Sequence, residues 1–159
     1  MLQQDCQPLQ VQLWLLQRDF TAMYNKLTKP NPFVQIGAMK SKYPQFKSKR
    51  FGDKVVFTGE LFIRPELPKY TISIEYDGNI RPKVTVISPV LVEKPPHTFS
   101  DKSLCLYHSK NFCWDAKKLV AKQIMDWTIE WIYFYEYWLQ TGTWIGPEVP
   151  HNNNDKKDE

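Results

Sequence analysis

The chain has 159 residues, of which 42% are hydrophobic and 24% are charged, and its formal net charge is +4. This length predicts a single domain over residues 1–150 that buries about 70% of its unfolded surface, and a polar tail at 151–159 that we expect to be disordered. The composition excludes a membrane span, because the most apolar helical stretch, 127–139, is too short and carries two glutamates.

Cysteine usage favours a cytoplasmic protein with reduced thiols. The three cysteines, Cys6, Cys105 and Cys113, form no CxxC pair, so neither a disulfide framework nor a zinc site is expected. We expect Cys113 to pack beside Trp114 and Cys6 to lie in a frayed terminus. The first residues lack a signal-peptide profile. No motif for a cofactor is present, so we expect neither a cofactor nor a metal.

The first predicted element is an amphipathic helix at 9–27. Its apolar residues follow a 4-3-4-3-4 spacing, which places them on one helix face: Leu9, Leu13, Leu16, Phe20, Met23 and Leu27. We expect this face to pack against the core. Pro30 and Pro32 are expected to end the helix.

The pattern then changes to β-structure, which continues as far as residue 89. A first strand is expected at 33–36, although 43–51 could hold it instead. Later strands are expected at 55–63, 70–76 and 83–87. The Asp77-Gly78 pair is a hairpin signal. Because the connections are short, these strands should form an antiparallel meander rather than parallel βαβ units.

Residues 40–51 are locally basic and carry three aromatic side chains between the charges. This composition is typical of a weak nucleic-acid surface. A solvated strand-and-turn region explains it as well, and no nucleic-acid motif accompanies it. We therefore do not expect nucleic acid to be the partner, and steep salt dependence of binding would indicate the contrary.

An irregular segment at 90–107, longer than most loops, follows the strands. Asp115 is the expected N-cap of a helix over 117–140, and Gly142 is expected to end that helix. Its apolar residues form two stripes, one of Trp127, Trp131, Phe134 and Trp138 and a neighbouring one of Ile124, Thr128, Ile132 and Tyr135. An apolar arc this wide predicts core packing rather than an aromatic binding face.

Cys105 lies in the irregular segment between Leu104 and Leu106. A thiol on a connecting segment can act as a nucleophile. Free cysteine is also among the most buried residue types and serves as a small apolar filler. The local sequence leaves both interpretations open.

The residues around Cys105 resemble the ubiquitin-conjugating-enzyme fold. That α+β fold has an N-terminal helix, a four-stranded antiparallel meander sheet, an active-site loop and C-terminal helices. Its members carry a His-Pro-Asn triplet, with the Asn eight residues before a catalytic cysteine, and a Trp segment eight or nine residues after it. Here 103–106 matches the cysteine context, Trp114 falls in the Trp segment, and His97 takes the Asn position. This replacement argues against ordinary isopeptide formation.

A closer resemblance is to the small ubiquitin-conjugating-like proteins of bacterial cyclic-oligonucleotide antiphage (CBASS) operons, the short type II conjugating-enzyme family. Members share a Leu-Cys-Leu-Tyr segment, an aromatic-rich Trp-Thr-x-Glu-Trp helix and a Thr-Gly-x-Trp end, which this chain carries at 104–107, 127–139 and 141–144. The resemblance implies that a cGAS-like nucleotidyltransferase is attached through its C-terminus to Cys105, and that it can pass onward to a lysine.

For such a reaction Cys105 would be the nucleophile. His97 could donate a hydrogen bond to the oxyanion in place of Asn or act as a base, or it could be a surface histidine beside two prolines. Asp101 and Lys102 could tune the thiol or an incoming amine, or could simply be solvated. His108, three residues after the cysteine, is a weaker candidate for the roles of His97.

Two functions fit these residues. The first is an enzyme, an acyltransferase of ubiquitin-conjugating type with a cysteine nucleophile. The alternative is a non-catalytic conjugating-like module that docks a partner protein without chemistry. The chain has no nucleotide-binding motif to activate a carboxylate, so an activating partner or a preactivated donor is implied. We expect a monomer or a small complex that does not associate with membranes.

Overall fold

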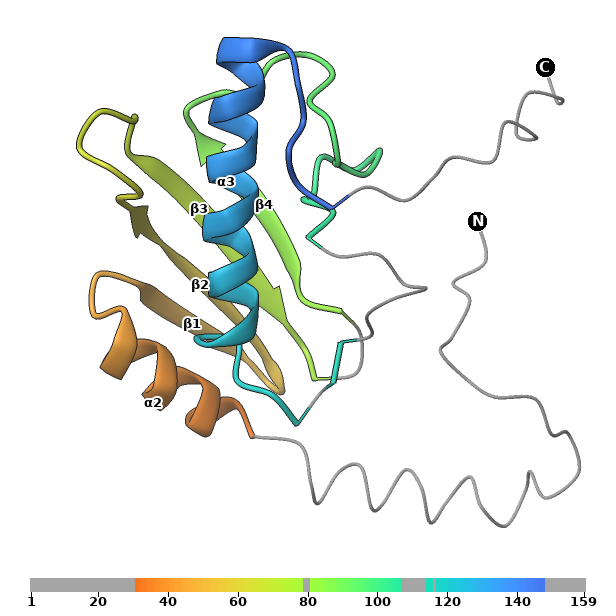
Figure 1. Cartoon of the computed structure of the whole chain (residues 1–159). Coiled ribbons are helices and arrows are strands. Elements are labelled where there is room, and N and C mark those ends of the chain that lie inside the picture. Colours follow the sequence, from red (N-terminus) through yellow and green to blue (C-terminus); the bar gives the residue numbers. More distant parts are fainter. Residues whose placement is uncertain (1–30, 79–80, 107–113, 116, 148–159) are drawn as a thin grey trace, which may run out of the picture.

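The computed structural model describes residues 31–78, 81–106, 114–115 and 117–147 (Figure 1). Within these residues the chain is an α+β protein with two helices and one four-stranded sheet. The elements are α2 (Pro32–Lys42), β1 (Lys47–Phe51), β2 (Lys54–Leu61), β3 (Tyr70–Tyr76), β4 (Lys83–Ser88) and α3 (Gln123–Thr141). The helix predicted at 9–27 and the tail at 151–159 lie outside the described residues.

The sheet is an antiparallel meander in the order β1-β2-β3-β4, which confirms the sequence prediction. Burial alternates along β3, where every second residue from Tyr70 to Tyr76 is buried. The register aligns Phe57 with Ile74 and Ile74 with Val84, and all three side chains are buried. A slip of one residue would turn such a row to the opposite face, so burial specifies the register.

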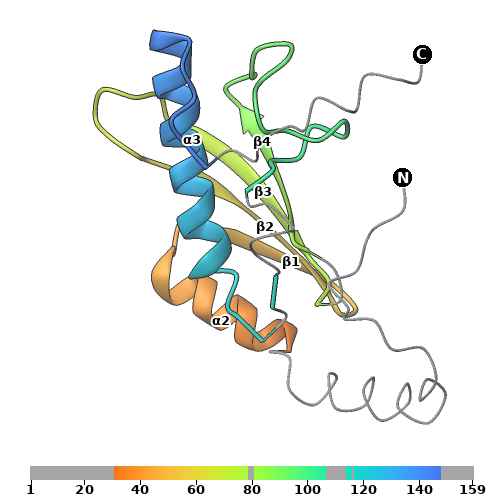
Figure 2. The ribbon, with the colours of Figure 1, turned by 45° about the vertical axis from the view of Figure 1, so that its right-hand side comes forward.

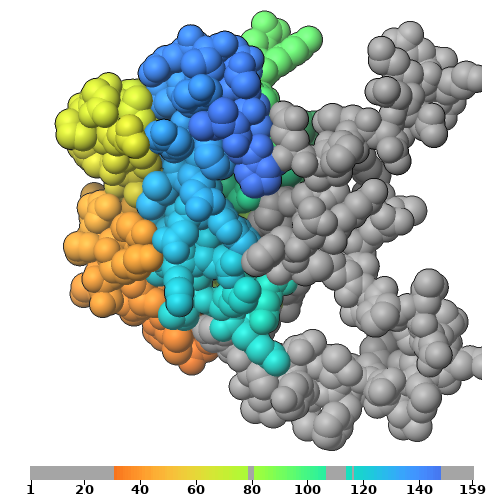
Figure 3. Space-filling view, viewed as in Figure 1, coloured from red at the N-terminus to blue at the C-terminus, as the bar shows by residue number. Residues whose placement is uncertain are grey.

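Both helices lie on the same side of the sheet (Figure 2). Helix α3 crosses the buried face of the sheet and hides it in the space-filling view (Figure 3), whereas α2 lies beside the β1 end (Figure 1). One predicted stripe of α3 is fully buried, namely Ile124, Thr128, Ile132 and Tyr135. The other stripe is half-buried except for Trp131, which is buried. Core packing therefore accounts for most of the apolar arc of α3.

A buried polar pair joins α3 to the sheet. The hydroxyl of Tyr70 donates a hydrogen bond to Glu136 Oε1, and both residues are buried. Burial, followed by this neighbouring carboxylate, raises the pKa of Tyr70 well above its ordinary value. The phenol therefore stays protonated and satisfies a carboxylate that would otherwise lie in the core without a partner.

The strand expected at 33–36 is wrong, because these residues belong to helix α2. Asn31 caps the helix by accepting a hydrogen bond from Val34 N at 3.0 Å, and Pro32 occupies the first turn. Proline suits that turn because its missing N–H would have no helical acceptor there. Pro32 thus begins a helix, whereas we expected it to end one. The first strand, β1, lies within the alternative range 43–51.

Helix α3 begins six residues later than the predicted start at Lys117. Asp115 does accept a hydrogen bond from Lys117 N, at 2.9 Å, but none of residues 117–122 is helical, and most of them lie in turns. The buried Gln35 side chain explains this delay, since its Oε1 accepts from Val120 N and its Nε2 donates to Lys118 O. These backbone groups are bound to α2 and not to a helix of their own. Gly142 ends α3 as predicted, with a φ of 72°.

The basic residues at 40–51 occupy the end of α2 and the edge strand β1, of which all five residues are exposed. Exposed lysines on an edge strand discourage pairing with other chains, so the fold accounts for them without a nucleic acid. Among the residues that the structure describes, no helix is long and apolar enough to span a bilayer.

Candidate active site

The segment around Cys105 forms a short antiparallel hairpin, which we call the site hairpin and define as residues 97–105. Thr98 and Leu104 face each other in a β-bridge. At the tip, Phe99 N donates to Ser103 O at 2.8 Å and Lys102 N donates to Phe99 O at 2.9 Å. Lys102 has a φ of 65°, which this tight turn requires. The predicted irregular loop therefore contains ordered structure where the cysteine lies.

The sheet holds one side of the site hairpin. Leu104 N donates to Val84 O at 2.8 Å, and Ser103 pairs with Thr85 in a β-bridge, so the hairpin extends the free edge of β4. Close by, the guanidinium of Arg81 lies 3.9 Å from the centre of the Phe99 ring. Such a contact adds a cation–π attraction between the start of β4 and the hairpin tip.

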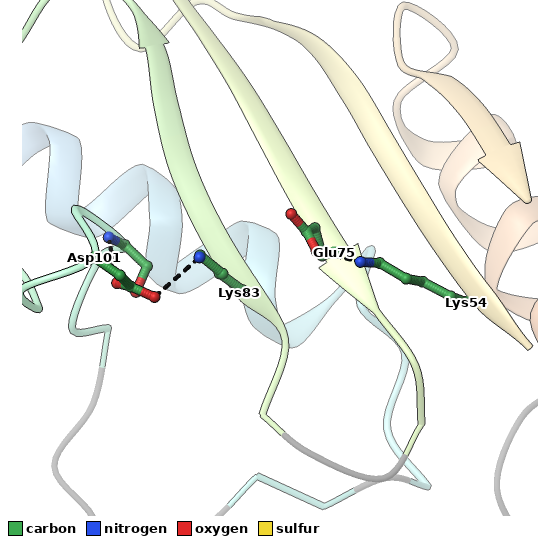
Figure 4. Close-up of polar contacts among 5 residues, drawn as sticks. Lys54, Glu75, Lys83 and Asp101 are labelled. Atoms are coloured by element: carbon green, nitrogen blue, oxygen red, sulfur yellow. Dashed lines mark hydrogen bonds and ion pairs between the residues drawn. The ribbon is translucent and has the colours of Figure 1, made fainter. Parts of the chain in front are cut away.

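An ion pair strengthens the same side. Lys83 Nζ on β4 lies 2.9 Å from Asp101 Oδ2, whereas a second pair, Lys54–Glu75, joins β2 to β3 away from the hairpin (Figure 4). Asp101 Oδ1 also accepts hydrogen bonds from Ser103 Oγ and Ser103 N. The Ser103 bonds, and then Lys83, lower the pKa of Asp101 well below its ordinary value. Asp101 is therefore ionised and holds the turn.

Helix α3 and the segment after it hold the other side of the site hairpin, through His97. The His97 carbonyl accepts from Cys105 N at 2.9 Å and from Trp131 Nε1 at 3.0 Å. The imidazole stacks on Trp144, with 4.5 Å between ring centroids and 26° between the planes. His97 has a φ of 51°, a left-handed conformation that non-glycine residues rarely adopt. Contacts to both its backbone and its ring hold this conformation.

Cys105 itself is half-buried. Its neighbour Leu104 is 3% exposed and fills the core, while Leu106 packs partly against the core. The residue is thus neither a fully buried filler nor fully exposed. The backbone of this half-buried cysteine is held by the hydrogen bond from Cys105 N to His97 O.

Comparison with known proteins identifies the family of the chain. A family model described as Type II CBASS E2 protein matches residues 35–152, more than half of the chain. The chain belongs to this family. No curated protein matches it. Membership in this family indicates that this CBASS E2 has a role in antiphage signalling. It also indicates that its partners are other CBASS proteins. The match includes the whole sheet, the site hairpin and α3.

The structure brings some of the predicted site residues of this CBASS E2 together. The backbone N–H of Cys105 donates a hydrogen bond to the His97 carbonyl, and the His97 ring stacks on Trp144. Asp101 contacts Ser103 and Lys83, so its described contacts serve the turn. Lys102 is exposed at the tip of the hairpin. His108, Cys113 and Cys6 lie outside the described residues.

Sequence reasoning gave no role in the site to Trp131 or Trp144. Both were noted only as part of an aromatic stripe or a family segment, although both contact His97. Trp131 lies 34 residues from His97 along the chain. The family motifs themselves were the only available signal, because they place tryptophans in α3 and just after it.

One hollow of about 430 Å³ lies near the start of α3, lined by Lys118, Leu119, Lys122, Gln123, Asp126 and Trp127. These residues precede Trp131, the α3 residue that contacts the site hairpin, by at least one helical turn. In the part of the chain that the structure describes, no group of three or more His, Cys, Asp or Glu side chains could hold a metal ion.

Proposed function

We propose that this CBASS E2 is a conjugating enzyme in which Cys105 forms a thioester with the C-terminal carboxyl of a cGAS-like nucleotidyltransferase. The thiol loses its proton, Sγ bonds to the carbonyl carbon of an activated carboxyl, and the activating group leaves with the bonding electrons. A lysine amine can then attack the same carbon, after which the Cys105 thiolate leaves. The proposal rests on the family and on the position of Cys105.

The observation that carries this proposal is the hydrogen bond between Cys105 N and His97 O. It fixes the cysteine beside the residue that takes the position of the Asn in ubiquitin-conjugating enzymes. The site hairpin is also bound to β4 on one side and to α3 on the other. Acyl transfer gains from such fixed positions, because reacting groups need to be held within a few ångströms and in a defined orientation.

We propose that His97 either stabilises the oxyanion by donating a hydrogen bond to it or acts as a base. Its ring is stacked on Trp144, so its orientation is set by packing rather than by solvent. We expect the ring to reach a group bound to Cys105 directly or through one water. His97→Ala should then slow conjugation, whereas His97→Asn should retain more of the rate because an amide can also donate a hydrogen bond. Equal conjugation by wild type and His97→Ala would reduce His97 to a loop residue.

The test of the thioester is co-expression with a cGAS-like nucleotidyltransferase. We expect a higher-mass adduct that a reducing agent removes. Cys105→Ser should give an adduct that thiols do not cleave, because an oxygen ester replaces the thioester, and Cys105→Ala should abolish the adduct. Deleting the last few residues of the partner should also abolish it while leaving the partner folded.

The rival function is a docking module without chemistry, and the same experiment decides between the two. A docking module would bind the nucleotidyltransferase tightly and form no covalent product under any condition. An adduct that survives Cys105→Ala would likewise rule out Cys105 as the nucleophile. In either case membership in the CBASS E2 family would stand, since the family match does not depend on the reaction.

A further inference from the structure

The carbonyl of His97 accepts two hydrogen bonds, one from the Cys105 amide at 2.9 Å and one from the Trp131 indole N–H at 3.0 Å. A backbone carbonyl has two lone pairs, so these donors use its full capacity. The backbone N–H of Cys105 and the indole N–H of Trp131, a residue of α3 that follows His97 by 34 positions, therefore bind the same oxygen atom.

His97 needs external support because its φ of 51° is unfavourable for a residue with a side chain. Backbone conformations of this kind persist where surrounding contacts over-determine them, and they are frequent at functional sites. The bond to Cys105 belongs to the site hairpin itself. The bond from Trp131 comes from α3, so it ties the hairpin to the rigid core of the protein.

Trp131 is well placed to give that support. It is 3% exposed, and its ring stacks on Tyr135 with 5.2 Å between centroids and 12° between planes. The ring of Trp131 also lies 6.0 Å from that of Trp144, which stacks on the His97 imidazole. The buried Trp131 side chain thus holds the His97 carbonyl itself and contacts Trp144, the residue that stacks on the His97 ring.

The two tryptophans differ in how they use their N–H groups. The buried Trp144 Nε1 has no hydrogen-bond partner among the described residues, whereas Trp131 Nε1 is bound to the site hairpin. Trp144 therefore acts through its ring, and a residue with a similar ring could replace it in part. At position 131 the N–H itself carries the contact, and phenylalanine cannot replace it.

We propose that Trp131 is a positioning residue for acyl transfer at Cys105, with its indole N–H holding the His97 carbonyl and, through it, the Cys105 backbone. This inference rests on the proposed thioester function. A purely structural role in the core would depend on the ring of Trp131 and not on its N–H, and this difference makes the two roles separable.

The test compares Trp131→Phe with wild type, using a synthetic peptide of the nucleotidyltransferase C-terminus as its 2-mercaptoethanesulfonate thioester. In this exchange Cys105 Sγ bonds to the peptide carbonyl carbon and the mercaptoethanesulfonate thiolate leaves. We expect the maximal rate of exchange to fall about threefold to tenfold, the range that corresponds to one lost hydrogen bond. The peptide concentration at half-maximal rate should not change, because Trp131 is 3% exposed and offers a peptide almost no surface.

A matched control is Trp138→Phe, which removes an indole from the same helix. Trp138 stacks on Tyr135 with 6.0 Å between centroids, and its replacement leaves both bonds to the His97 carbonyl in place. Its maximal rate should equal that of wild type. Amide hydrogen exchange gives a second readout that needs no substrate, since exchange at Cys105 N–H should accelerate in Trp131→Phe and not in Trp138→Phe.

The outcomes separate this inference from the function on which it rests. Equal maximal rates for wild type and Trp131→Phe would overturn the inference alone. A wild-type protein that accepts no acyl group would overturn the proposed function, and the positioning role with it. Because Trp131→Phe also removes part of the buried ring, benzothienylalanine at position 131 is measured beside it, since this residue replaces the N–H with sulfur at nearly the same shape. It should show the same loss of rate, and a wild-type rate in this variant would also overturn the inference. If Trp131→Phe does not fold, the benzothienylalanine variant alone decides.

Discussion

Lys83 and Asp101 join strand β4 to the site hairpin through an ion pair of 2.9 Å, and the same carboxylate caps the hairpin turn at Ser103. One acidic side chain therefore contributes both to the turn and to its attachment to the sheet, together with the backbone bonds of the hairpin. Asp101 precedes Cys105 by four residues. We therefore expect the position of the proposed nucleophile to respond to the charge state of this group.

The first prediction concerns pH. Folding lowers the pKa of Asp101 below its ordinary value of 3.8, so the ionised form stabilises the folded protein. This contribution is fully present above the unfolded pKa and is lost as pH falls through the folded pKa. We expect Asp101→Asn to lower the free energy of unfolding at pH 7 by at most about 1 kcal/mol, because the side chain is half exposed.

Denaturant unfolding at pH 7 and pH 3 measures this difference, which should shrink at the lower pH. The control is Glu75→Gln, which removes the similarly exposed Lys54–Glu75 pair without contacting the hairpin. Only Asp101→Asn should accelerate amide exchange within the site hairpin. A loss of stability that is the same at both pH values would contradict an ionised Asp101 as its cause.

The second prediction concerns thiol reactivity. Cys105 is half-buried on the site hairpin, and we expect iodoacetamide to alkylate it in the folded protein faster than it alkylates Cys113. Peptide mass spectrometry at short reaction times measures both rates. Complete protection of Cys105 until the protein unfolds would remove the enzymatic function, since a partner's carboxyl could not reach the thiol either.

The third prediction concerns Gly146, which lies against Phe134 and against Trp144, the ring that stacks on His97. A Cβ atom there would lie 2.6 Å from Phe134 Cδ2 and 2.7 Å from Trp144 Nε1, closer than atoms can approach. We expect Gly146→Ala to lower the free energy of unfolding by about 1–3 kcal/mol, as overpacking usually does, and to displace Trp144 from the His97 ring. Chemical denaturation and the imidazole resonances of His97 report the two effects.

Gly37→Ala is the matched control for that change. Gly37 lies within α2, and a Cβ atom there would meet nothing within 4 Å. The same substitution should therefore raise the free energy of unfolding by about 0.5–1 kcal/mol through helix propensity. A stabilising effect at both glycines would show that the chain around Gly146 moves aside freely.

The fourth prediction concerns Gln35, whose buried amide joins α2 to the turns before α3. Gln35→Leu leaves Val120 N without its acceptor, in a place that water does not reach. We expect the free energy of unfolding to fall by about 1–3 kcal/mol, the usual cost of an unsatisfied buried group. Gln45→Leu, at an exposed amide that donates to Glu60 O, should change it by less than about 0.5 kcal/mol. Equal effects at the two positions would show that the turns before α3 do not depend on Gln35.

The local sequence predicted the elements whose signals are local. Strand β3 has the predicted bounds, because alternation over seven residues and a following Asp-Gly turn need no distant partner. The same reasoning failed at 33–36, where β-type side chains outweighed a cap signal from Asn31 and Pro32. It also placed the start of α3 too early, since the bonds from Gln35 to 118–120 come from another helix.

The candidate site shows the same division. Family spacing singled out Cys105 and His97, because the hairpin joins residues eight apart and their relation is largely local. The tertiary structure alone decided that the His97 carbonyl meets Trp131 and that its ring meets Trp144. Those contacts depend on how α3 packs across the sheet, and packing is settled by the burial of many side chains together rather than by any short stretch of sequence.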